Sequence, residues 1–469
     1  MKEDAYRHLS LNDFGRLHLR LMTTVITYGT YDLLHQGHIN LLRSAKKLGD
    51  YLIVGVTSDN FDRERGKFNV RNNILERVDA VRATGYADEV IIEDYVGQKI
   101  DDIQKYGVDI FAIGSDWEGM FDYLNEYCKV VYLPRTQGIS STQLRAESQE
   151  TIKLGIIGTG RIAARFIPEV ECINGMKVTA VFNPNEKEAF DFAYCHGFLQ
   201  HFSDLHAFFE NVDCVYIASP HLSHYEYTKN SLFAGKHVLC EIPFVLSGTE
   251  ARELYTIADE KGLILLEASK TAHCPAWNHL LAQVKSGIIG EVVDVKASLS
   301  KLMVKAGREF DKQQAGGAMT ELSPLCLMAV LKILGNEIKD TRFISKMMDG
   351  VDIFTEGILM FEKSVASISL GLGVKTEGNL VISGTKGYVL VPSPWWLTNF
   401  FEVCFEDQNK NKKYFYTYQG DGLRYEIQEF ASMIFNNRLI SYRLQKKESI
   451  AIADIIEIYR QGENTTILG

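Results

Sequence analysis

Short apolar runs alternate with helical patterns along the first third of the chain. Over 23–147, runs typical of buried strands are separated by segments whose apolar residues recur at helical spacing. The runs lie at 23–28, 51–57, 89–92, 109–113 and 130–133, and the helical segments at 39–48, 75–84 and 100–106. Strands that alternate with helices predict a parallel sheet with helices on both faces. We therefore expect one Rossmann-like α/β domain over 23–147, after an N-terminal extension at 1–22.

A second series of this kind begins after the polar segment 146–151. Its strands and helices predict a doubly wound, dinucleotide-binding sheet over 148–275. Beyond about residue 290 the pattern changes, and runs with short glycine turns follow one another at 291–299, 352–361, 364–372, 379–383 and 388–391. This change predicts an α+β domain with an open antiparallel sheet over 276–469. The expected fold class is therefore α/β, with three domains in this order.

The charge balance limits the partners that these domains can have. The chain has 469 residues, with 50 Lys or Arg against 60 Asp or Glu, and its net charge is −10. Nucleic acids and anionic membranes are bound through basic surface, so this balance is unfavourable for both. We expect a small-molecule substrate, no nucleic acid and no membrane.

The cysteines and the N-terminus indicate a cytoplasmic protein. The eight cysteines include no C-x-x-C pair, which is typical of reduced, buried thiols and disfavours a cysteine-ligated zinc. The first residues, MKEDAYRHLS, lack the apolar core of a signal peptide. No apolar run approaches the length of about 18 residues that suggests a membrane span.

The first candidate site is the segment YGTYDLLHQGHINLL at 28–42. A strand is predicted to end at Tyr28 and a helix to start near Gly37. His35 and His38 are three residues apart, so they share one face of a helical turn. At a helix N-terminus, free N–H groups and the dipole attract anions, and two imidazoles can donate to phosphate oxygens as charge develops. For H-x-G-H alone, two surface histidines on an unrelated turn are an equal alternative.

This segment resembles the nucleotidyltransferase signature of the glycerol-3-phosphate cytidylyltransferase family. The resemblance continues in order through AKKLGDYLIVGVTSD (45–59), ERVDAVRATGYADEVI (76–91), IGSDWEGMFD (113–122) and RTQGISST (135–142). The last segment is similar to the second family signature, R-T-x-G-I-S-T-T. The resemblance implies cytidylyl transfer from CTP, with Mg²⁺, to a phosphate monoester and release of pyrophosphate. Such chemistry needs positioning and charge stabilisation rather than a covalent intermediate.

The resemblance also implies roles for individual residues. His35 and His38 would contact the triphosphate, and Lys46 would bind phosphate unless it belongs to a solvated helix face. The nucleotide-binding residues would be Gly29, Thr30, Tyr31, Asp32, Arg77, Asp116, Trp117, Arg135, Gly138, Ile139, Ser140, Ser141 and Thr142. Among them, Asp32 and Asp116 would serve the metal or the nucleotide, and the segment from Arg135 to Thr142 would form a second phosphate cradle. Arg63 and Arg65 either reach the acceptor phosphate or lie in a charged surface loop.

The second candidate site is GIIGTGRIA at 155–163. Gly158-x-Gly160-x-x-Ala163 is the dinucleotide-binding pattern with alanine as the last small residue, and it lies between a predicted strand and a predicted helix. The second strand is predicted to end at Asn183, where a carboxylate would bind the ribose and repel a 2′-phosphate. Because asparagine is neutral, the sequence permits NAD(H) or NADP(H) and mildly favours NADP(H).

From 151 to 469 the chain resembles the Gfo/Idh/MocA oxidoreductase family. The similar segments are at 212–243, 281–295, GGAMTEL at 316–322 and SGTKGYVLVP at 383–392. The resemblance implies hydride transfer between a nicotinamide and a sugar or polyol carbon, and a homo-oligomer, a dimer or larger. The cofactor-binding residues would be Gly158, Thr159, Gly160, Arg161, Ile162, Asn183, Ser219, Pro220, His221, His224 and Glu241. His221 and His224 could also be a metal pair, although no third ligand is in view.

Two departures from this family pattern concern the proton donor. The family's E-K-P is E-I-P here, so Ile242 replaces the usual lysine. In the family's G-G-A-x-x-D-x-G-x-H, Glu321 replaces the aspartate and Leu325 the histidine. Reduction of a carbonyl still needs a proton donor beside the developing alkoxide. The predicted catalytic groups are Lys270, His273 and Glu321, with Lys301 as a weaker candidate.

Together the two resemblances predict a bifunctional enzyme. The first domain would activate a sugar or polyol phosphate with CTP, and the second would reduce the sugar carbonyl. The product would be a CDP-activated alditol for a capsule or a teichoic-acid-like polymer. One alternative is a cytidylyltransferase that carries an inactive module for dimerisation or nicotinamide sensing. Another is a first domain that takes ATP rather than CTP.

Overall fold

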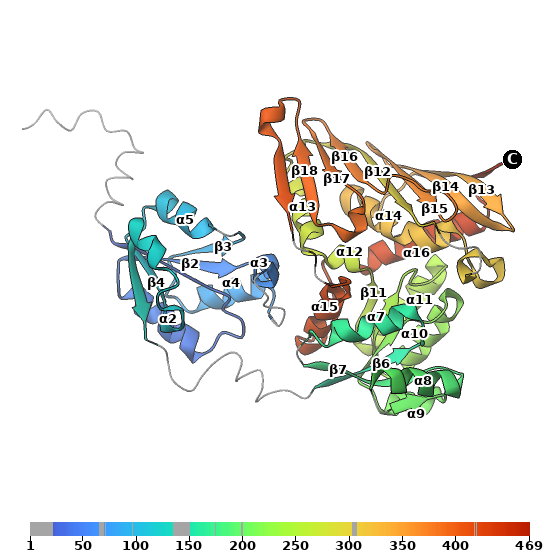
Figure 1. The fold of residues 1–469 in the computed structure, drawn as a ribbon, viewed down its shortest axis with the longest axis horizontal. Coiled ribbons are helices and arrows are strands. Elements are labelled where there is room, and N and C mark those ends of the chain that lie inside the picture. The colour runs from blue at the N-terminus through green and yellow to red at the C-terminus, as the bar shows by residue number, and fades with distance from the viewer. Residues whose placement is uncertain are drawn as a thin grey trace, which may run out of the picture. The chain divides into compact units, whose positions relative to one another are not determined.

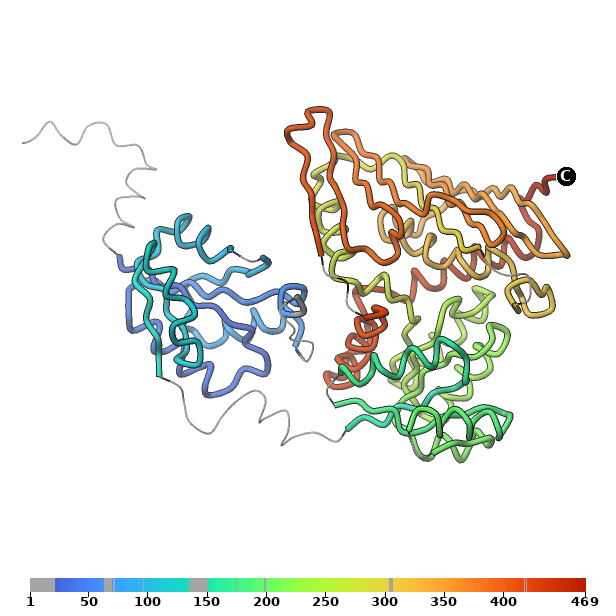
Figure 2. The backbone as a smooth tube through the Cα atoms, viewed as in Figure 1, coloured from blue at the N-terminus to red at the C-terminus, as the bar shows by residue number. Residues whose placement is uncertain are grey.

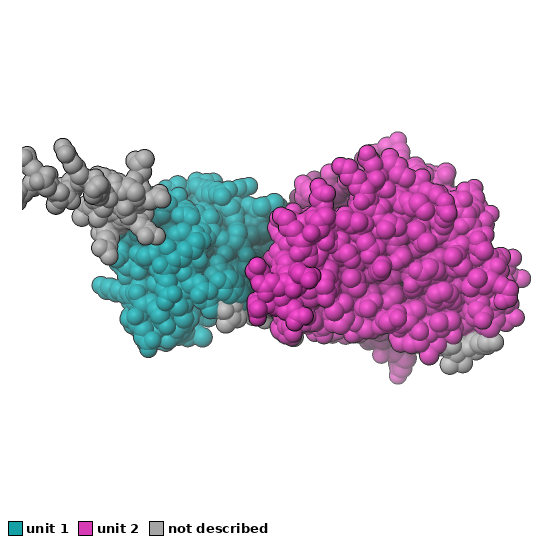
Figure 3. Space-filling view, turned by 90° about the horizontal axis from the view of Figure 1, so that it is seen from above, with its two compact units in different colours: residues 1–150 teal, residues 151–469 magenta. Residues whose placement is uncertain are grey.

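The computed structural model describes residues 22–64, 70, 72–95, 97–134, 151–173, 175–197, 200–302, 307–416, 418 and 420–469. The chain divides into two compact units, Met1–Glu150 and Thr151–Gly469 (Figure 3). Each unit has its own hydrophobic core, so each is described by itself.

The first unit is a parallel sheet with helices on both faces (Figure 1). Its strand order is β3-β2-β1-β4-β5, with all neighbours parallel. The strands are β1 (Thr24–Gly29), β2 (Tyr51–Thr57), β3 (Glu89–Glu93), β4 (Ile110–Gly114) and β5 (Lys129–Leu133). The helices are α2 (Gln36–Lys46), α3 (Asp59–Glu64), α4 (Ile74–Ala83), α5 (Gln98–Tyr106), η1 (Ser115–Trp117) and η2 (Asp122–Glu126).

Burial on both faces explains why the strands of this unit read as continuous apolar runs. On one face, Leu42 of α2 and Val78 of α4 belong to the same buried cluster as Val54. On the other face, Ile103 of α5 is buried with Phe111. The strand order reverses between β1 and β4, and ligands bind at the carboxyl ends of the strands at such a point.

The second unit begins with a doubly wound parallel sheet, as the sequence predicts. Its order is β11-β10-β9-β6-β7-β8, which reverses between β6 and β9. The strands are β6 (Ile152–Ile157), β7 (Met176–Phe182), β8 (Gln200–Phe202), β9 (Cys214–Ile217), β10 (His237–Glu241) and β11 (Leu265–Ala268). The helices are α7 (Arg161–Val170), α8 (Glu186–His196), α9 (Leu205–Glu210), η3 (His221–Ser223), α10 (His224–Phe233), α11 (Gly248–Lys261), α12 (Lys270–His273) and α13 (Pro275–Lys285).

A nine-stranded sheet follows, in the order β19-β18-β17-β16-β12-β15-β14-β13-β20. It is mixed rather than purely antiparallel, because β12 pairs with β15, and β13 with β20, in parallel. The strands are β12 (Val292–Ser300), β13 (Asp340–Met348), β14 (Val351–Met360), β15 (Val365–Gly371), β16 (Leu380–Gly384), β17 (Tyr388–Val391), β18 (Phe400–Cys404), β19 (Lys412–Phe415) and β20 (Thr465–Leu468). Short helical turns are η4 (Arg308–Phe310), η5 (Lys312–Gln314), η6 (Trp395–Leu397) and η7 (Gln408–Lys410).

Helix α14 (Ala318–Leu334) packs beneath this sheet and is buried nearly all round (Figure 1). Among the described residues, Lys312–Leu334 is the one helical stretch long and apolar enough to cross a membrane, and 78% of its apolar window is buried inside the fold. A helix that is apolar on every side is typical of a protein core as well as of a membrane span.

The chain then returns to the first sheet of this unit. Helix α15 (Leu423–Phe435) contributes Ile427 and Phe430 to the buried cluster that holds Phe166 of α7. Arg424 and Glu169 form an ion pair of 2.8 Å between the same two helices. In Figures 1 and 2 the red α15 lies beside the green α7, and α16 (Lys446–Arg460) runs between the sheets. The core of the predicted domain 148–275 thus includes a helix from the predicted domain 276–469.

Candidate active sites

The structure forms the predicted imidazole pair at the N-terminus of α2. His35 is the N-cap residue, and its Nδ1 accepts a hydrogen bond from the Gly37 N–H at 3.1 Å. In the neutral ring the proton is therefore on Nε2. The His35 and His38 rings are stacked, with centroids 3.9 Å apart. Two imidazoles and the N–H groups of a helix N-terminus thus lie together, as an anion site requires.

The loop between β1 and α2 holds strained backbone. Tyr31 has φ 53° and Leu33 has φ 47°, in the left-handed region that such side chains rarely adopt. A Cβ on Gly29 would lie 3.0 Å from the Tyr31 ring, and that ring packs edge-on against His38 with centroids 5.5 Å apart. Asp32 is buried, and its carboxylate accepts a hydrogen bond from the Asn72 N–H at 2.9 Å. Strain of this kind is typical of loops that hold a functional site in one geometry.

Arg77 holds this loop in place. Its side chain is fully buried, and its guanidinium donates to the carbonyl oxygens of Thr30, Thr57 and Asn72 and to the carboxylates of Asp59 and Asp62 at 2.6–3.3 Å. Thr30 in turn donates to Asp62 at 2.7 Å. These bonds all go to protein acceptors, so Arg77 positions the loop, and its predicted role as a nucleotide ligand stays a prediction.

Lys46 lies at the opposite end of α2 from the imidazole pair, and its predicted phosphate contact stays a prediction. It is the last residue of α2, ten positions beyond the N-terminal residue, which corresponds to about 15 Å along a helix axis. Its ammonium donates to the Asp50 carbonyl oxygen at 2.6 Å and to the Asp88 carboxylate at 2.5 Å. Asp88 also accepts from the Leu52 N–H at the start of β2. Lys46 therefore stabilises the opposite edge of the sheet.

Asp116 and Trp117 form η1 directly after β4, at the carboxyl edge of the sheet. Asp116 is exposed, and the Trp117 ring packs against Phe121 with centroids 6.0 Å apart. The second predicted phosphate cradle lies outside the described residues, as do Arg65 and the side chain of Arg63. Its members are Arg135, Gly138, Ile139, Ser140, Ser141 and Thr142.

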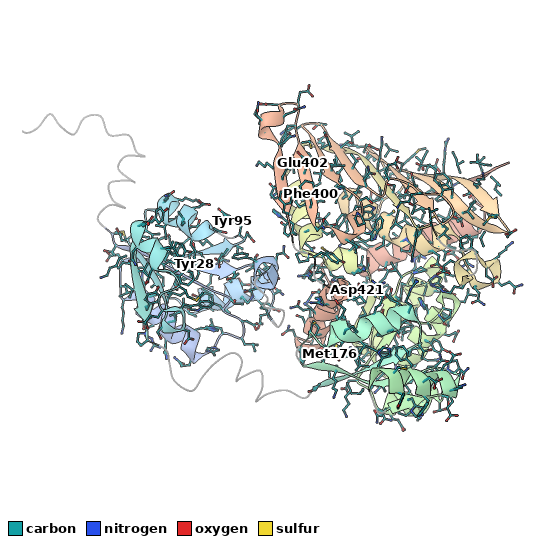
Figure 4. The ribbon with its side chains drawn as sticks, viewed as in Figure 1. Tyr28, Tyr95, Met176, Phe400, Glu402 and Asp421 are labelled. Atoms are coloured by element: carbon teal, nitrogen blue, oxygen red, sulfur yellow. The ribbon has the colours of Figure 1, made fainter. Side chains whose placement is uncertain are left out.

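Lys99 is a cation at this edge that the sequence analysis did not single out. Its ammonium contacts the Glu93 carboxylate at the end of β3 and lies 4.6 Å from the centre of the Tyr28 ring (Figure 4). Glu93 also accepts from the Thr57 hydroxyl at 3.0 Å. An acidic residue at the end of an apolar strand, followed by a lysine at the next helix, is the signal that could have found this pair.

The second site is a cavity of about 840 Å³ at the carboxyl ends of β6, β7, β9 and β10. The residues predicted to bind the dinucleotide all line it: Gly158, Thr159, Gly160, Arg161, Ile162, Asn183, Ser219, Pro220, His221, His224 and Glu241. Glu321 lines the same cavity, as do Glu188 and Arg308, which the sequence analysis did not name.

The glycine turn of this cavity fits a pyrophosphate. Gly158 has φ 110°, and a Cβ there would lie 2.6 Å from the Ala218 carbonyl oxygen. Gly160 caps the N-terminus of α7, and a Cβ there would have no heavy atom within 4 Å. Space is therefore left beside the N-terminus of α7, where backbone N–H groups can donate to the pyrophosphate of a dinucleotide.

A carboxylate lies at the end of β7, where the sequence analysis expected none. The Asn183 amide donates to the Thr159 hydroxyl at 2.7 Å and to the Glu188 carboxylate at 3.0 Å. Glu188 is in the first turn of α8, and the Asn185 amide also donates to it at 3.1 Å. The end of β7 at Asn183 is neutral, but the Glu188 carboxylate from α8 places a negative charge beside it.

His221 and Glu321 meet across the cavity from distant parts of the chain. His221 Nε2 is 2.8 Å from Glu321 Oε1, and Arg308 Nη1 is 3.5 Å from the same oxygen. Burial raises the pKa of Glu321, but His221 and Arg308 outweigh it and hold the pKa below its usual range. Among the described residues, no group of three or more His, Cys, Asp or Glu side chains could hold a metal ion.

His224 does not form a metal pair with His221. Its two ring nitrogens each lie 2.9 Å from a backbone carbonyl oxygen, those of Pro243 and Ser219. Burial lowers the pKa of His224 to about 4, so the ring is neutral near pH 7. His224 therefore links two loops that border the cavity.

A buried cluster lies behind Glu241. The Tyr216 hydroxyl and the Ile242 N–H both donate to the Glu241 carboxylate, and burial raises the pKa of Glu241 to about 7. Lys270 interacts with this carboxylate, and its ammonium donates to the Asp421 carbonyl oxygen at 2.7 Å. Asp421 precedes α15 and pairs with Arg165 at 2.7 Å (Figure 4).

Three predicted proton donors are absent from the described lining of the cavity: Lys270, His273 and Lys301. Lys270 is tied to the segment before α15, although burial lowers its pKa as predicted. His273 is fully buried beside Glu429, and its carbonyl oxygen accepts from Arg443. Lys270 and His273 directly follow β11, and α15 covers this end of the sheet, so both side chains lie against the α15 segment instead of in the cavity. Of the predicted donors, Glu321 alone lines the cavity.

The folds and sites define an α/β nucleotidyltransferase-type domain followed by a dinucleotide-binding oxidoreductase. A family model described as cytidylyltransferase-like matches residues 26–147, and one for the oxidoreductase family with an NAD-binding Rossmann fold matches 152–269. The chain is 52% identical to the glycerol-3-phosphate cytidylyltransferase of Bacillus spizizenii over 131 residues, which cover 27% of this chain and 97% of that one. The chain therefore belongs, through its first domain, to the glycerol-3-phosphate cytidylyltransferase-like family.

The second unit is a Gfo/Idh/MocA oxidoreductase domain. It is 26% identical to the trans-1,2-dihydrobenzene-1,2-diol dehydrogenase of Oryctolagus cuniculus over 324 residues, 66% of this chain and 98% of that one. A 3-ketoreductase from Actinomadura kijaniata, solved with NADP and TDP-benzene, has the same fold, with a TM-score of 0.62 at 21% identity over 68% of this chain and 100% of that one. The protein is thus an enzyme that carries a cytidylyltransferase domain and an NAD(P) oxidoreductase domain.

Proposed function

We propose that the chain makes a CDP-activated alditol in two reactions. The first domain transfers a cytidylyl group from CTP to a sugar or polyol phosphate, and the second reduces the sugar carbonyl with NAD(P)H. The observation that carries this proposal is the coexistence of a stacked imidazole pair at a helix N-terminus and a dinucleotide cavity in one chain. Covalent fusion supports one cytoplasmic pathway, with a capsule or teichoic-acid-like polymer as its destination.

The transfer reaction would rest on charge stabilisation at the start of α2. Pyrophosphate leaves as the acceptor phosphate bonds to the α-phosphorus, and negative charge grows on the phosphate oxygens. Nδ1 of His35 accepts from the Gly37 N–H, which fixes the ring at the start of the helix and places the proton of the neutral ring on Nε2. Arg77 keeps the loop from Thr30 to Asp32 in register with β2. Mg²⁺ would add charge neutralisation, with Asp32 and Asp116 as its predicted partners.

In the second domain the nicotinamide supplies a hydride to the carbonyl carbon when it is bound. The chain's own residues prepare the cavity for it. The N-terminus of α7 would hold the pyrophosphate, and Asn183 and Glu188 would border the adenosine ribose. The side chains of Glu241, His221 and Glu321 line the remaining part of the cavity.

Glu188 is expected to weaken NADPH binding relative to a neutral side chain. A carboxylate at this place accepts a ribose hydroxyl but repels a 2′-phosphate. Glu188→Gln should tighten NADPH binding about 10-fold and leave NADH binding within about 3-fold, the scale of one lost charge contact. Dinucleotide fluorescence titration measures both constants. Glu186→Gln, on the same helix turn, is the control, and equal NADPH affinity in wild type and Glu188→Gln would refute the role.

The open face of the nine-stranded sheet supports the predicted homo-oligomer. Phe343 and Ala366 point into the core beneath the sheet, and their neighbours Ile344 and Val365 are 38% and 39% exposed on the other side. Tyr388 is 43% exposed on β17. Exposed apolar side chains on a broad sheet are typical of a surface that another chain covers.

Two assays test the proposed function against its alternatives. The first follows pyrophosphate release with a panel of CTP, ATP, GTP and UTP and with polyol phosphates, and CTP is expected to be the preferred donor. The second follows oxidation of NADH and NADPH with keto-sugar phosphates. Pyrophosphate release without any carbonyl reduction would favour a cytidylyltransferase with an inactive module, and preference for ATP would overturn the CTP assignment.

A further inference from the structure

We propose that His221 is the proton donor of the reductase and that Glu321 is the residue that positions it. This proposal rests on the proposed reduction of a carbonyl in the second domain. It replaces the sequence-based assignment of the donor to Lys270. The positions at which the family resemblance places a lysine and a histidine hold Ile242 and Leu325, which carry no transferable proton.

The geometry brings one imidazole to the cavity and fixes it there. His221 begins η3, directly after β9, and Glu321 lies in the first turn of α14, a hundred residues further along the chain. Their side chains are 5% and 13% exposed, and both line the cavity. A bond of 2.8 Å between Nε2 and the carboxylate holds the ring in one orientation. Nδ1 of His221 is buried and has no hydrogen-bond partner among the described residues, so it is the ring nitrogen that no protein group engages.

The charges around the ring suit a donor. Glu321 is ionised, because His221, Arg308 and Lys301 together outweigh its burial. A carboxylate at this distance accepts the Nε2–H of the imidazole and fixes the ring. Other charged or titratable groups lie near this pair: Arg308 and Lys301 act on Glu321, Glu309 and Glu241 line the same cavity, and the His224 ring packs edge-on against His221. His224 is neutral and its single N–H faces one of the two backbone carbonyl oxygens beside its ring nitrogens, so it does not compete as a donor.

Two rival donors are less suited. Lys270 does not line the described cavity and donates to the Asp421 carbonyl oxygen. Glu241 does line the cavity, but its two carboxylate oxygens accept from the Tyr216 hydroxyl and the Ile242 N–H. Burial raises the pKa of Glu241 to about 7, but both of its oxygens are engaged by protein donors, whereas Nδ1 of His221 is not.

The proposed step adds a hydride and a proton across the carbonyl group. The carbonyl carbon gains a hydride and its C–O π bond breaks, so the electron pair moves to oxygen. The Nδ1–H bond of the imidazolium breaks, and its proton bonds to that oxygen to give the alcohol. The neutral ring, still held by Glu321 through Nε2, regains a proton from water. Nothing beyond the reduced nicotinamide and water is consumed.

The test compares His221→Gln, Glu321→Gln and Glu321→Asp in the full-length chain. Reduction of the keto-sugar phosphate should fall about 10²–10⁴-fold in His221→Gln, the range for a lost general acid. It should fall about 10–100-fold in Glu321→Gln, the range for a lost positioning group, and recover in part in Glu321→Asp. Dinucleotide affinity by fluorescence and pyrophosphate release by the first domain should stay within about 3-fold of wild type. His206→Gln is the matched control, because His206 is a histidine on the surface of α9 with an 86% exposed side chain.

The pH profile separates a chemical role from a structural one. A reduction that depends on a general acid should become slower as the pH rises, because the acid loses the proton that it must donate. The fall in reduction rate at high pH should be absent in His221→Gln and retained in Lys270→Met. A His221→Gln enzyme with the wild-type rate and the wild-type pH dependence would overturn the proposal. So would loss of the fall in rate at high pH in Lys270→Met alone. A wild-type chain that binds the dinucleotide but reduces no carbonyl would instead overturn the proposed reductase function, and this proposal with it.

Discussion

Replacing His35 or His38 with alanine is expected to lower CTP-dependent pyrophosphate release by about 10²–10³-fold. Each change removes one donor from the place where charge grows on the triphosphate, and losses of this size follow from such a removal. The rings are stacked 3.9 Å apart at the N-terminus of α2, so neither can take over the position of the other. Steady-state release of pyrophosphate from CTP and a polyol phosphate measures the effect.

The second domain serves as the internal control for this prediction. Its core is separate from that of the first unit, so NAD(P)H-dependent reduction should be unchanged in both variants. His206→Ala, on the surface of α9, provides the matched substitution. Near-normal pyrophosphate release in His35→Ala and His38→Ala would contradict the assignment of this site.

Arg77→Met is expected to destabilise the first unit by about 3–5 kcal/mol, the cost of breaking a buried ion pair by removing one partner. The change leaves the buried carboxylate of Asp62 without its cation and the carbonyl oxygens of Thr30 and Thr57 without their donor. Cytidylyl transfer should be lost with the loop geometry. Hydrogen exchange of β1 and β2 in the full-length chain measures the local loss of stability.

Arg82→Met on the same helix is the control for this change. Arg82 is 63% exposed and its ion pair with Asp79 is 3.8 Å long, so little stability should be lost. Exchange in the Rossmann sheet of the second unit should be the same in all three proteins. Unchanged exchange in β1 and β2 of Arg77→Met, with a selective loss of CTP binding, would show that Arg77 contacts the nucleotide instead.

The parallel sheets could be predicted because strands that are buried on both faces form continuous apolar runs in the sequence. Runs such as 51–57 are apolar throughout, and the structure buries them on both faces. The imidazole pair was equally local, since spacing along one helical turn decides whether two rings meet. Lys46 shows the limit of a local argument, because the same helix that brings the histidines together carries this residue to the other edge of the sheet.

The features that the sequence did not predict depend on contacts between distant segments. Helix α15 returns to the Rossmann sheet after the nine-stranded sheet, and this return is what covers Lys270 and His273. The parallel pairing of β13 with β20 joins segments more than a hundred residues apart. The bond between His221 and Glu321 has the same origin. Local hydrophobic periodicity and residue spacing do not predict contacts between segments that are far apart in the sequence.

Mass spectrometry of the products distinguishes the proposed two-step synthesis from transfer alone. The intact enzyme would be given CTP, a reduced nicotinamide dinucleotide and keto-sugar phosphates from trioses to heptoses. We expect a CDP-linked alditol, heavier by one hydride and one proton than the CDP-linked unreduced sugar, and formed only when CTP and the reductant are both present. A CDP-linked product that is the same with and without the reductant, while the dinucleotide stays unconsumed, would contradict the two-step synthesis.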